Sequence, residues 1–168
     1  MDYLIVDGYN VIGSWDDLKE LKKADLGQAR DRLVEYMADY QAYTGVRVIV
    51  IFDAQFVPGM ESKQEAYKIE VIYTKKNETA DECIEKIVTT YKNAMNQVYV
   101  ATSDYMEQRI TFGRGALRKS ARELLVEVES IVREIDYKII TQKKSQPQIK
   151  IPLNESVLQT FEKWRRRK

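Results

Sequence analysis

The chain has no histidine and a single cysteine among its 168 residues. Without histidine, the Ser-His and Cys-His nucleophile pairs and the histidine acid/base pairs of metal-free ribonucleases are excluded. The lone Cys83 cannot form a disulfide within the chain, and a structural zinc site would have almost no ligands to use. Any hydrolytic chemistry must therefore depend on carboxylates, which favour a hard divalent metal ion.

Long apolar runs are also absent. No stretch of about 18 apolar residues exists, and Met1 leads directly into a predicted strand without the charged-then-apolar pattern of a signal segment. We therefore expect a cytoplasmic protein with no membrane partner. The length of 168 residues predicts one folded domain with a full hydrophobic core.

The net charge of +1 is unevenly distributed. Residues 142–168 hold eight Lys or Arg against Glu155 and Glu162, a net charge of +6, which leaves −5 for residues 1–141. This asymmetry predicts a folded domain over residues 1–141, followed by a basic linker and C-terminal helix over residues 142–168.

Apolar patterns predict strands that alternate with helices. Strands are expected at residues 4–6, 46–52, 69–73 and 97–101, with a fifth, edge strand at 137–140. Helices are expected to begin near residues 26, 79, 120 and 154, and residues 111–115 look like a glycine loop. This order predicts an α/β fold, a three-layer α/β/α sandwich with a central parallel sheet of four or five strands.

Acidic residues stand where the predicted strands end. Asp7, Asp53 and Asp104 follow the first, second and fourth predicted strands, and Asp81 opens the helix after the third. Each alone could be structural, because acids are favoured in the first turn of a helix. In a parallel sheet, however, all four fall on one edge, and two carboxylates about 4 Å apart repel by roughly 4 kcal/mol at an effective dielectric of 20. The gathered acids therefore predict a bound Mg²⁺ or Mn²⁺.

Three short motifs then occur in order at successive strand ends. They are Asp7-Gly8-Tyr9-Asn10, Glu78-Thr79-Ala80-Asp81 and Thr102-Ser103-Asp104. This ordered set resembles the NYN nucleases, a branch of the PIN-like superfamily. The glycine loop followed by residues 120–125 is similar to the YacP-like subgroup, and the resemblance covers about residues 1–140.

The resemblance implies a PIN-like fold and a metal-dependent endoribonuclease. For the YacP-like subgroup it also implies a cytoplasmic role in mRNA turnover associated with the ribosome, so that RNA and not DNA is the expected partner. Asp7, Asp81 and Asp104 would be the catalytic metal ligands for Mg²⁺ or Mn²⁺, with Asn10 and Ser103 in support. Asp53 stands with the supporting residues, and its role stays open.

Two groups of basic residues are candidates for RNA binding. Those after the fourth strand could grip phosphates that flank the cleaved bond, or could form a solvated helix face: Arg114, Arg118, Lys119 and Arg122. Those at the C-terminus could dock the acidic body on a large RNA such as the ribosome, or could complement a helix end: Arg165, Arg166, Arg167 and Lys168.

Aromatic residues near the predicted site have two explanations. Tyr9, Tyr105 and Phe112 could stack on unpaired bases of single-stranded RNA. Core packing is the favoured explanation for all three, because aromatic side chains are usually buried.

Two other function classes are compatible with the pattern. A phosphoacceptor receiver domain is also a parallel α/β sheet with acidic strand ends, but it needs paired acids after the first strand and a lysine after the last. Here Asp7 stands alone and no convincing lysine follows a fifth strand. The other class is a non-catalytic RNA- or ribosome-binding module with vestigial acids, and the presence of Asp7, Asp81 and Asp104 speaks against it.

Overall fold

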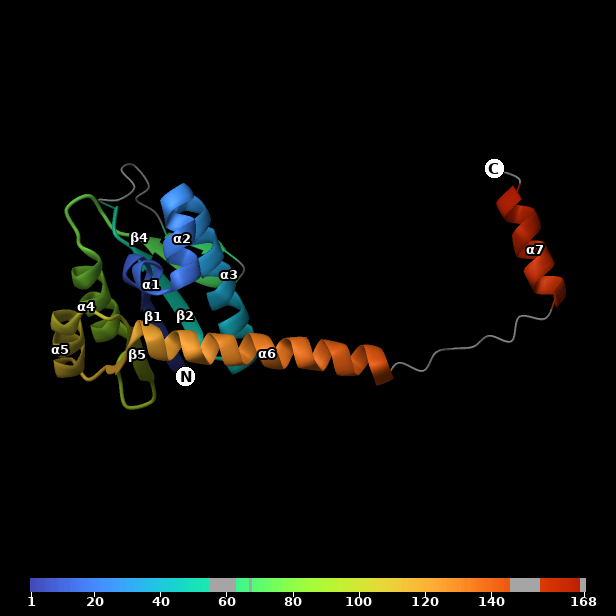
Figure 1. The fold of residues 1–168 in the computed structure, drawn as a ribbon. Helices are drawn as coiled ribbons and strands as arrows, with labels where there is room; N and C mark the ends of the chain where they lie inside the picture. The colour runs from blue at the N-terminus through green and yellow to red at the C-terminus, as the bar shows by residue number, and fades with distance from the viewer. Residues whose placement is uncertain (55–62, 67, 146–154, 167–168) are drawn as a thin grey trace. The chain divides into compact units, whose positions relative to one another are not determined.

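The computed structural model describes residues 1–54, 63–66, 68–145 and 155–166. These residues form six strands and seven helices (Figure 1). The strands are β1 (Asp2–Asp7), β2 (Arg47–Phe52), β3 (Lys63–Ala66), β4 (Ile69–Tyr73), β5 (Gln97–Ala101) and β6 (Leu117–Lys119). The helices are α1 (Gly8–Ser14), α2 (Asp16–Ala24), α3 (Leu26–Thr44), α4 (Ala80–Tyr91), α5 (Tyr105–Gly113), α6 (Ala121–Ser145) and α7 (Glu155–Arg166). Within these residues no helix combines the length and apolarity that crossing a membrane requires.

The strands join in one sheet with the order β3-β4-β2-β1-β5-β6. The five neighbouring strands β4, β2, β1, β5 and β6 run parallel, and β3 pairs antiparallel with β4 at one edge. β1 lies between β2 and β5, so that Val6 stands opposite Val50 on one side and Ala101 on the other. The predicted α/β fold with a central parallel sheet is confirmed, and β3 is an additional antiparallel strand.

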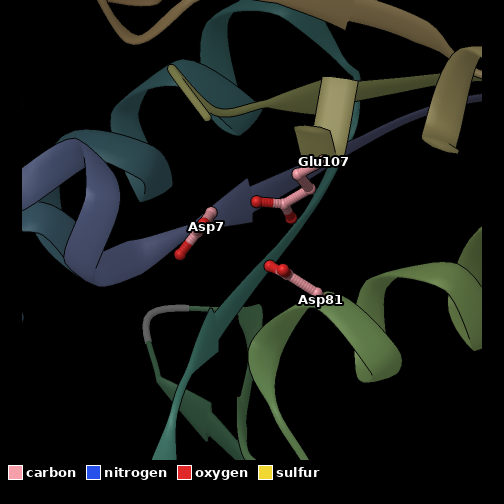
Figure 2. Close-up of side chains that lie close together, drawn as sticks. All are labelled: Asp7, Asp81 and Glu107. Carbon is pink, nitrogen blue, oxygen red and sulfur yellow. The ribbon is translucent and has the colours of Figure 1, made fainter. Parts of the chain in front are cut away.

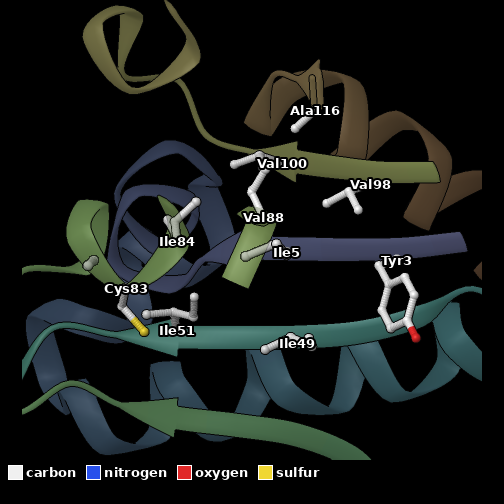
Figure 3. Packing of buried hydrophobic residues seen from close by; sticks show 11 residues of the cluster. Tyr3, Ile5, Ile49, Ile51, Cys83, Ile84, Val88, Val98, Val100 and Ala116 are labelled. Carbon is white, nitrogen blue, oxygen red and sulfur yellow. The ribbon is translucent and has the colours of Figure 1, made fainter. Parts of the chain in front are cut away.

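The central strands are buried on both faces of the sheet. On one face, Ile5 and Ile49 pack with Ile84 of α4 in a continuous apolar cluster (Figure 3). Residues that alternate with them, such as Leu4 and Val50, are equally buried, and α1 and α3 contact β1 and β2 there. A parallel strand covered on both faces requires a continuous apolar run, which explains the pattern seen in the sequence.

The predicted helix ends are confirmed. Gly45 ends α3 with a φ of 73°, a left-handed conformation that glycine adopts without strain. Thr79 caps α4, because its hydroxyl accepts the N–H of Glu82 at 3.2 Å. At the start of α6 the Glu123 N–H donates to the Ser120 hydroxyl at 3.1 Å, and the Ser120 N–H donates to the Glu123 carboxylate at 3.4 Å. Both bonds of a capping box are therefore present.

One predicted segment is wrong, and another is only partly right. Residues 137–140 do not form an edge strand but continue α6, and the fifth parallel strand is β6. Of the predicted glycine loop at residues 111–115, the first three residues end α5 and the last two form a turn. Gly115 follows with a φ of 87°, and the N–H of Ala116 returns to the Thr111 carbonyl at 3.0 Å. This closed turn leads directly into β6.

The chain divides into two compact units, Met1–Glu134 and Ile135–Lys168. The first unit contains the whole sheet and α1 to α5, and the second contains the last residues of α6 together with α7. The predicted division after residue 141 falls within α6 and stays a prediction. Of the predicted basic linker, residues 146–154 lie outside the described residues.

Candidate active site

Asp7 ends the central strand β1, where the chain turns at once into α1. This turn requires glycine at position 8, because a Cβ atom there would lie 2.3 Å from Cε1 of Phe52 and 2.9 Å from the carbonyl oxygen of Ile51. Gly8 therefore lets α1 begin directly against β2. The Asp7 carboxylate is held at the carboxyl edge of the sheet, which is where open parallel sheets bind ligands.

Three carboxylates from three different elements meet at this edge. Asp7 comes from β1, Asp81 from the first turn of α4 and Glu107 from α5, and their side chains point toward one another (Figure 2). One oxygen of each lies within 4.8 Å of the others. Asp81 is exposed, whereas Glu107 is only 2% exposed. Among the described residues this is the one group of three His, Cys, Asp or Glu side chains placed to hold a metal ion, and we call it the carboxylate cluster.

Thr102 joins two members of the carboxylate cluster. Its fully buried hydroxyl oxygen lies 3.1 Å from Oε2 of Glu107 and 3.4 Å from Oδ2 of Asp7. The same oxygen accepts the backbone N–H of Asp104 at 3.1 Å. A hydroxyl group has one proton, so Thr102 can donate to only one of the two carboxylates at a time.

The carboxylate cluster is incompletely neutralised by the protein. Oε1 of Glu107 is buried and has no hydrogen-bond partner. Burial, followed by the charge of Asp7 and the hydrogen bond to it, raises the pKa of Glu107 to about 10. Burial also raises the pKa of Asp7, and the nearby charge of Asp81 adds to that rise. Without a cation, Glu107 therefore keeps a proton at neutral pH and shares it with Asp7.

Asn10 and Ser103, the predicted supporting residues, fix the end of β5 to its neighbours. The side-chain carbonyl Oδ1 of Asn10 accepts the backbone N–H of Ser103 at 2.7 Å. The Ser103 hydroxyl in turn accepts the N–H of Ala121 at 3.4 Å, at the start of α6. These bonds place the segment that carries Thr102 next to Asp7.

Asp53 and Asp104 stand at the same edge of the sheet but outside the carboxylate cluster. Oδ2 of Asp53 accepts the N–H of Ala80 at 3.3 Å, at the first residue of α4. Oδ1 of Asp104 accepts the N–H of Glu107 at 3.3 Å, as expected for the residue that caps α5. The geometry thus differs from the set implied for the metal ligands, because Glu107 and not Asp104 is the third carboxylate of the group. Asp104 instead turns toward the backbone of its own helix.

A pocket of about 310 Å³ opens beside the carboxylate cluster. Its lining combines acidic, polar and apolar residues with one lysine: Asp7, Tyr9, Asn10, Lys22, Leu26, Asp53, Ala80 and Asp81. The pocket gives a ligand access to Asp7 and Asp81 from the side of α1 and α2.

Comparison with known proteins identifies the family. The sequence model of the YacP-like NYN domain matches residues 4–166. This chain belongs to the YacP-like NYN domain family. Its relative in Bacillus subtilis strain 168, named uncharacterized protein YacP, is 57% identical over 166 residues, which cover 99% of this chain and 98% of the relative.

Solved structures agree with this YacP-like NYN assignment. A crystal structure of Rae1 (YacP) from Bacillus subtilis is 57% identical, has a TM-score of 0.79 and is matched over 99% of this chain and 95% of that one. A second, of the W164L mutant of that protein, is 52% identical with a TM-score of 0.78, over 99% and 96% of the two chains. The predicted family and PIN-like α/β fold are therefore confirmed. NYN domains are of nuclease type, so the carboxylate cluster lies in a nuclease-type fold.

Lys119 of this YacP-like NYN chain ends β6, the fifth parallel strand. A lysine therefore stands at the end of the last parallel strand, which the sequence patterns did not predict, but it pairs with Glu127 and not with the carboxylate cluster. Its Nζ lies 2.8 Å from both carboxylate oxygens of Glu127, and its side chain is only 15% exposed. The residue predicted to contact RNA at this position is thus engaged in an ion pair.

The three predicted arginines near the site are exposed. Arg114 lies 3.8 Å from Glu85, and its side chain is 56% exposed. Arg118 donates to the side-chain carbonyl of Gln108 at 3.2 Å. Together with Arg122 they leave cationic groups on the surface around β6 and the start of α6. Their role in RNA binding stays a prediction.

The predicted C-terminal basic residues are only partly described. Arg165 and Arg166 are exposed in the last turn of α7, and Arg167 and Lys168 lie outside the described residues. Exposure agrees with either explanation of these residues, docking on RNA or a solvated helix end.

The predicted core packing of the aromatic residues holds only in part for Tyr9, which is half-buried and also lines the pocket. Its ring centroid lies 5.1 Å from that of Phe52, and its hydroxyl accepts a hydrogen bond from Arg30 at 3.3 Å. Tyr105 and Phe112 are instead 69% and 67% exposed, so core packing is wrong for both. They lie on α5, a helix that the sequence patterns did not predict.

Proposed function

We propose that the protein is a divalent-metal-dependent endoribonuclease, which cleaves single-stranded RNA by attack of water on a phosphodiester. The observation that carries this proposal is the carboxylate cluster of Asp7, Asp81 and Glu107 at the ligand-binding edge of a nuclease-type fold. Oxygen ligands in this number suit Mg²⁺ or Mn²⁺, which bind protein carboxylates together with water and substrate phosphate.

The chemistry of the three side chains fits a cation. The unpartnered, buried Oε1 of Glu107 would gain a partner, and leaving such an atom without one costs about 1–3 kcal/mol. A cation would also replace the proton that Glu107 shares with Asp7 and would offset the repulsion that both feel from Asp81. The nuclease-type fold adds support, because this kind of site commonly uses divalent ions.

The residues around the site have separate tasks in this proposal. Asp7, Asp81 and Glu107 would hold the ion, which supplies a water of lowered pKa and positive charge for the phosphodiester. Thr102 would keep the carboxylates of Asp7 and Glu107 in place through its hydroxyl. Asn10 holds the strand end that carries Thr102.

We further infer that the substrate is mRNA in the cytoplasm, and that the protein meets it on the ribosome. The nuclease-type fold supports an RNA substrate. The sequence from residue 163 to residue 168 holds five Lys or Arg, and the first 141 residues have a net charge of −5. An acidic body is repelled by RNA, and a basic segment would offset that repulsion by phosphate contacts and counterion release.

Cleavage is tested with the pure protein and end-labelled single-stranded RNA in EDTA, Mg²⁺ or Mn²⁺, with and without translating ribosomes. We expect metal-dependent internal cuts that disappear in Asp7→Asn, because the amide removes a ligand without changing the shape of the side chain. Binding of RNA without cuts in any of these conditions would instead indicate a non-catalytic RNA-binding module. Parental cleavage by Asp7→Asn at saturating metal would contradict the assignment of the site.

Ribosome association is tested separately by co-sedimentation across a salt series. Removal of residues 163–168 should reduce co-sedimentation at moderate salt, while a short RNA is still cut at a similar rate. A matched variant that keeps Trp164 and replaces only Arg165 and Arg166 by Gln separates loss of charge from loss of the ring. Unchanged co-sedimentation in both variants would leave the basic residues as a solvated helix end.

A further inference from the structure

One face of α5, the helix that supplies Glu107 to the carboxylate cluster, carries exposed aromatic side chains. Tyr105 is the first residue of this nine-residue helix and is 69% exposed. Phe112 lies in its last turn and is 67% exposed. An aromatic side chain can bury about 150–250 Å² when a partner covers it. Two on one short helix therefore point to a binding surface.

The two rings lie on the same side of α5, with an arginine between them. Tyr105, Arg109 and Phe112 occupy positions i, i+4 and i+7, which fall within about 60° of the helix circumference. All three are exposed, and we call them the α5 stripe. At a rise of 1.5 Å per residue the two rings are about 10 Å apart along the axis, so one base cannot contact both. Two bases can stack there, and the Arg109 guanidinium between them can contact a phosphate.

The opposite face of α5 belongs to the active site. Glu107 and Thr111 are buried there, and the Thr111 hydroxyl donates to the Glu107 carbonyl at 2.9 Å. The helix begins next to Asp104, whose N–H donates to Thr102, the residue that contacts the carboxylate cluster. An RNA strand that leaves the carboxylate cluster past the start of α5 therefore reaches Tyr105 before Phe112.

The α5 stripe has the charge that a nucleic acid requires. Besides Arg109, the exposed Arg114 and Arg118 follow the end of the helix, within a domain that is acidic overall. Aromatic faces for the bases and arginine for the phosphates are the two components of surfaces that bind single strands. RNA is favoured over a protein partner because the same helix supplies Glu107 to the proposed cleavage site.

We propose that the α5 stripe is a stacking platform that binds two unpaired bases of the RNA strand extending from the cleavage site. The RNA class rests on the proposed function, whereas the stacking geometry does not depend on metal. Duplex RNA cannot use the α5 stripe, because its bases already stack on one another. The α5 stripe would thus make the enzyme select single strands.

Binding is measured with the full chain in EDTA, by fluorescence anisotropy of a short labelled RNA offered as a single strand and as a duplex. Tyr105→Ala and Phe112→Ala should each weaken single-strand binding by about 5- to 100-fold in Kd. Tyr105→Phe and Phe112→Tyr should bind like the parent, because either ring stacks. Tyr43→Ala is the matched control. Tyr43 is an exposed tyrosine near the end of α3, which precedes the start of β2, whereas the carboxylate cluster lies at the carboxyl ends of the strands. This variant should keep the parental affinity for RNA.

A salt series separates stacking from charge. Arg109→Ala should lower the slope of log Kd against log salt by about 1, whereas the aromatic variants should keep the parental slope. Thermal unfolding followed by circular dichroism should show parental stability for each variant, because all three side chains are exposed.

The result that supports the platform is loss of single-strand binding in both alanine variants with rescue in both aromatic ones. Parental affinity of Tyr105→Ala and Phe112→Ala would overturn it, as would equal affinity of the parent for single strand and duplex. Absence of any RNA binding would also overturn it and would favour a protein partner for the α5 stripe. If the parent binds through the α5 stripe but cuts no RNA with any metal, the proposed function fails and the platform stands. If it cuts RNA and the alanine variants bind normally, the platform alone fails.

Discussion

Five of the described acidic side chains at the carboxyl edge of the sheet fall into two groups. Asp53 and Asp104 each accept a backbone N–H at the start of a helix. Asp7, Asp81 and Glu107 instead face one another within 4.8 Å. The two groups lie at the same edge of one sheet, yet the first is bound by the backbone and the second has the geometry of a ligand site.

The difference shows that a strand-end position does not decide the role of a carboxylate. What distinguishes the groups is where the side chain points, because Asp7 at the cap position of α1 faces Asp81 and Glu107, whereas Asp104 accepts an N–H of its own helix. An aspartate at the cap position reaches the N–H two or three residues ahead, which places Asp104 on its own helix. Glu107 lies on the inner side of that helix, where it faces Thr102 and the carboxylates of Asp7 and Asp81.

The largest expected effect is on the cleavage rate, when one member of each group is substituted in a separate variant. Glu107→Gln should lower the cleavage rate by at least about 100-fold, because it removes a proposed metal ligand. Asp104→Asn should lower it less than about tenfold, because asparagine caps a helix as well as aspartate does. Single-turnover cleavage over a Mn²⁺ series compares the two, with circular dichroism to confirm folding.

The opposite order of effects would reverse the comparison. If Asp104→Asn loses more activity than Glu107→Gln and excess Mn²⁺ restores part of it, Asp104 is the third ligand, as the sequence motif implied. Glu107 would then be a buried acid without a role in metal binding.

The second effect is a dependence of stability on pH in metal-free buffer. Burial and the charge of Asp7 raise the pKa of Glu107 from 4.5 to about 10 in the folded protein. Between these values the folded state holds a proton that the unfolded chain has released. The contribution of Glu107 is therefore fully present below pH 4.5 and is lost as the pH rises toward about 10, by at most about 1.4 kcal/mol per pH unit.

Urea unfolding in EDTA at several pH values measures this linkage. The free energy of unfolding of the parent should fall more steeply with rising pH than that of Glu107→Gln, which cannot titrate at this position. Parallel pH profiles of the two proteins would show that Glu107 is ionised in the folded state. The burial of an ionised Glu107 in the carboxylate cluster without a metal ion would then need another explanation.

Much of the fold was predictable, because local and tertiary requirements agree in those segments. The apolar runs that become β1 and β2 are long enough only for strands covered on both faces. Gly45 and Thr79 mark helix ends by their own backbone and side-chain chemistry. The closeness of Asp7 and Asp81 was predictable for the same reason, since each stands at such a boundary on the same edge of the sheet.

The segment between β5 and β6 was not predictable from these patterns. α5 has polar residues on its buried face, including Glu107, Gln108 and Thr111, so no apolar repeat marks it as a helix. Its start, Asp104 followed by Glu107 three residues later, has the form of a capping box. That pattern would have predicted that the Glu107 carboxylate accepts the backbone N–H of Asp104 and does not face Asp7. The signal that could have found Glu107 is that unusual polar inner face.

The error at residues 137–140 has a different cause. The segment Tyr137-Lys138-Ile139-Ile140 has the composition of a short strand. Neither glycine nor proline, however, occurs between Ala121 and Ser145 to end the helix. The helix therefore continues, with Tyr137 and Ile140 exposed. Propensity over four residues is a weak prior against an uninterrupted helix.

The smallest expected effects concern stability without metal, and their sign distinguishes the two groups of acids. Asp53→Ala and Asp104→Ala should each lower the free energy of unfolding by about 0.5–2 kcal/mol, because each leaves a helix N–H without its acceptor. Asp81→Asn should not lower it, because it removes a negative charge that disfavours the ionised forms of Asp7 and Glu107. Urea unfolding in EDTA provides these values, and repetition in saturating Mn²⁺ provides the control. Mn²⁺ should stabilise the parent and both alanine variants much more than Asp81→Asn, since an ion that binds only the folded state stabilises it by an amount that rises with the logarithm of its affinity. Equal stabilisation of all four proteins by Mn²⁺ would place the ion away from Asp81, and a loss of stability in metal-free Asp81→Asn would make that residue structural like the other two.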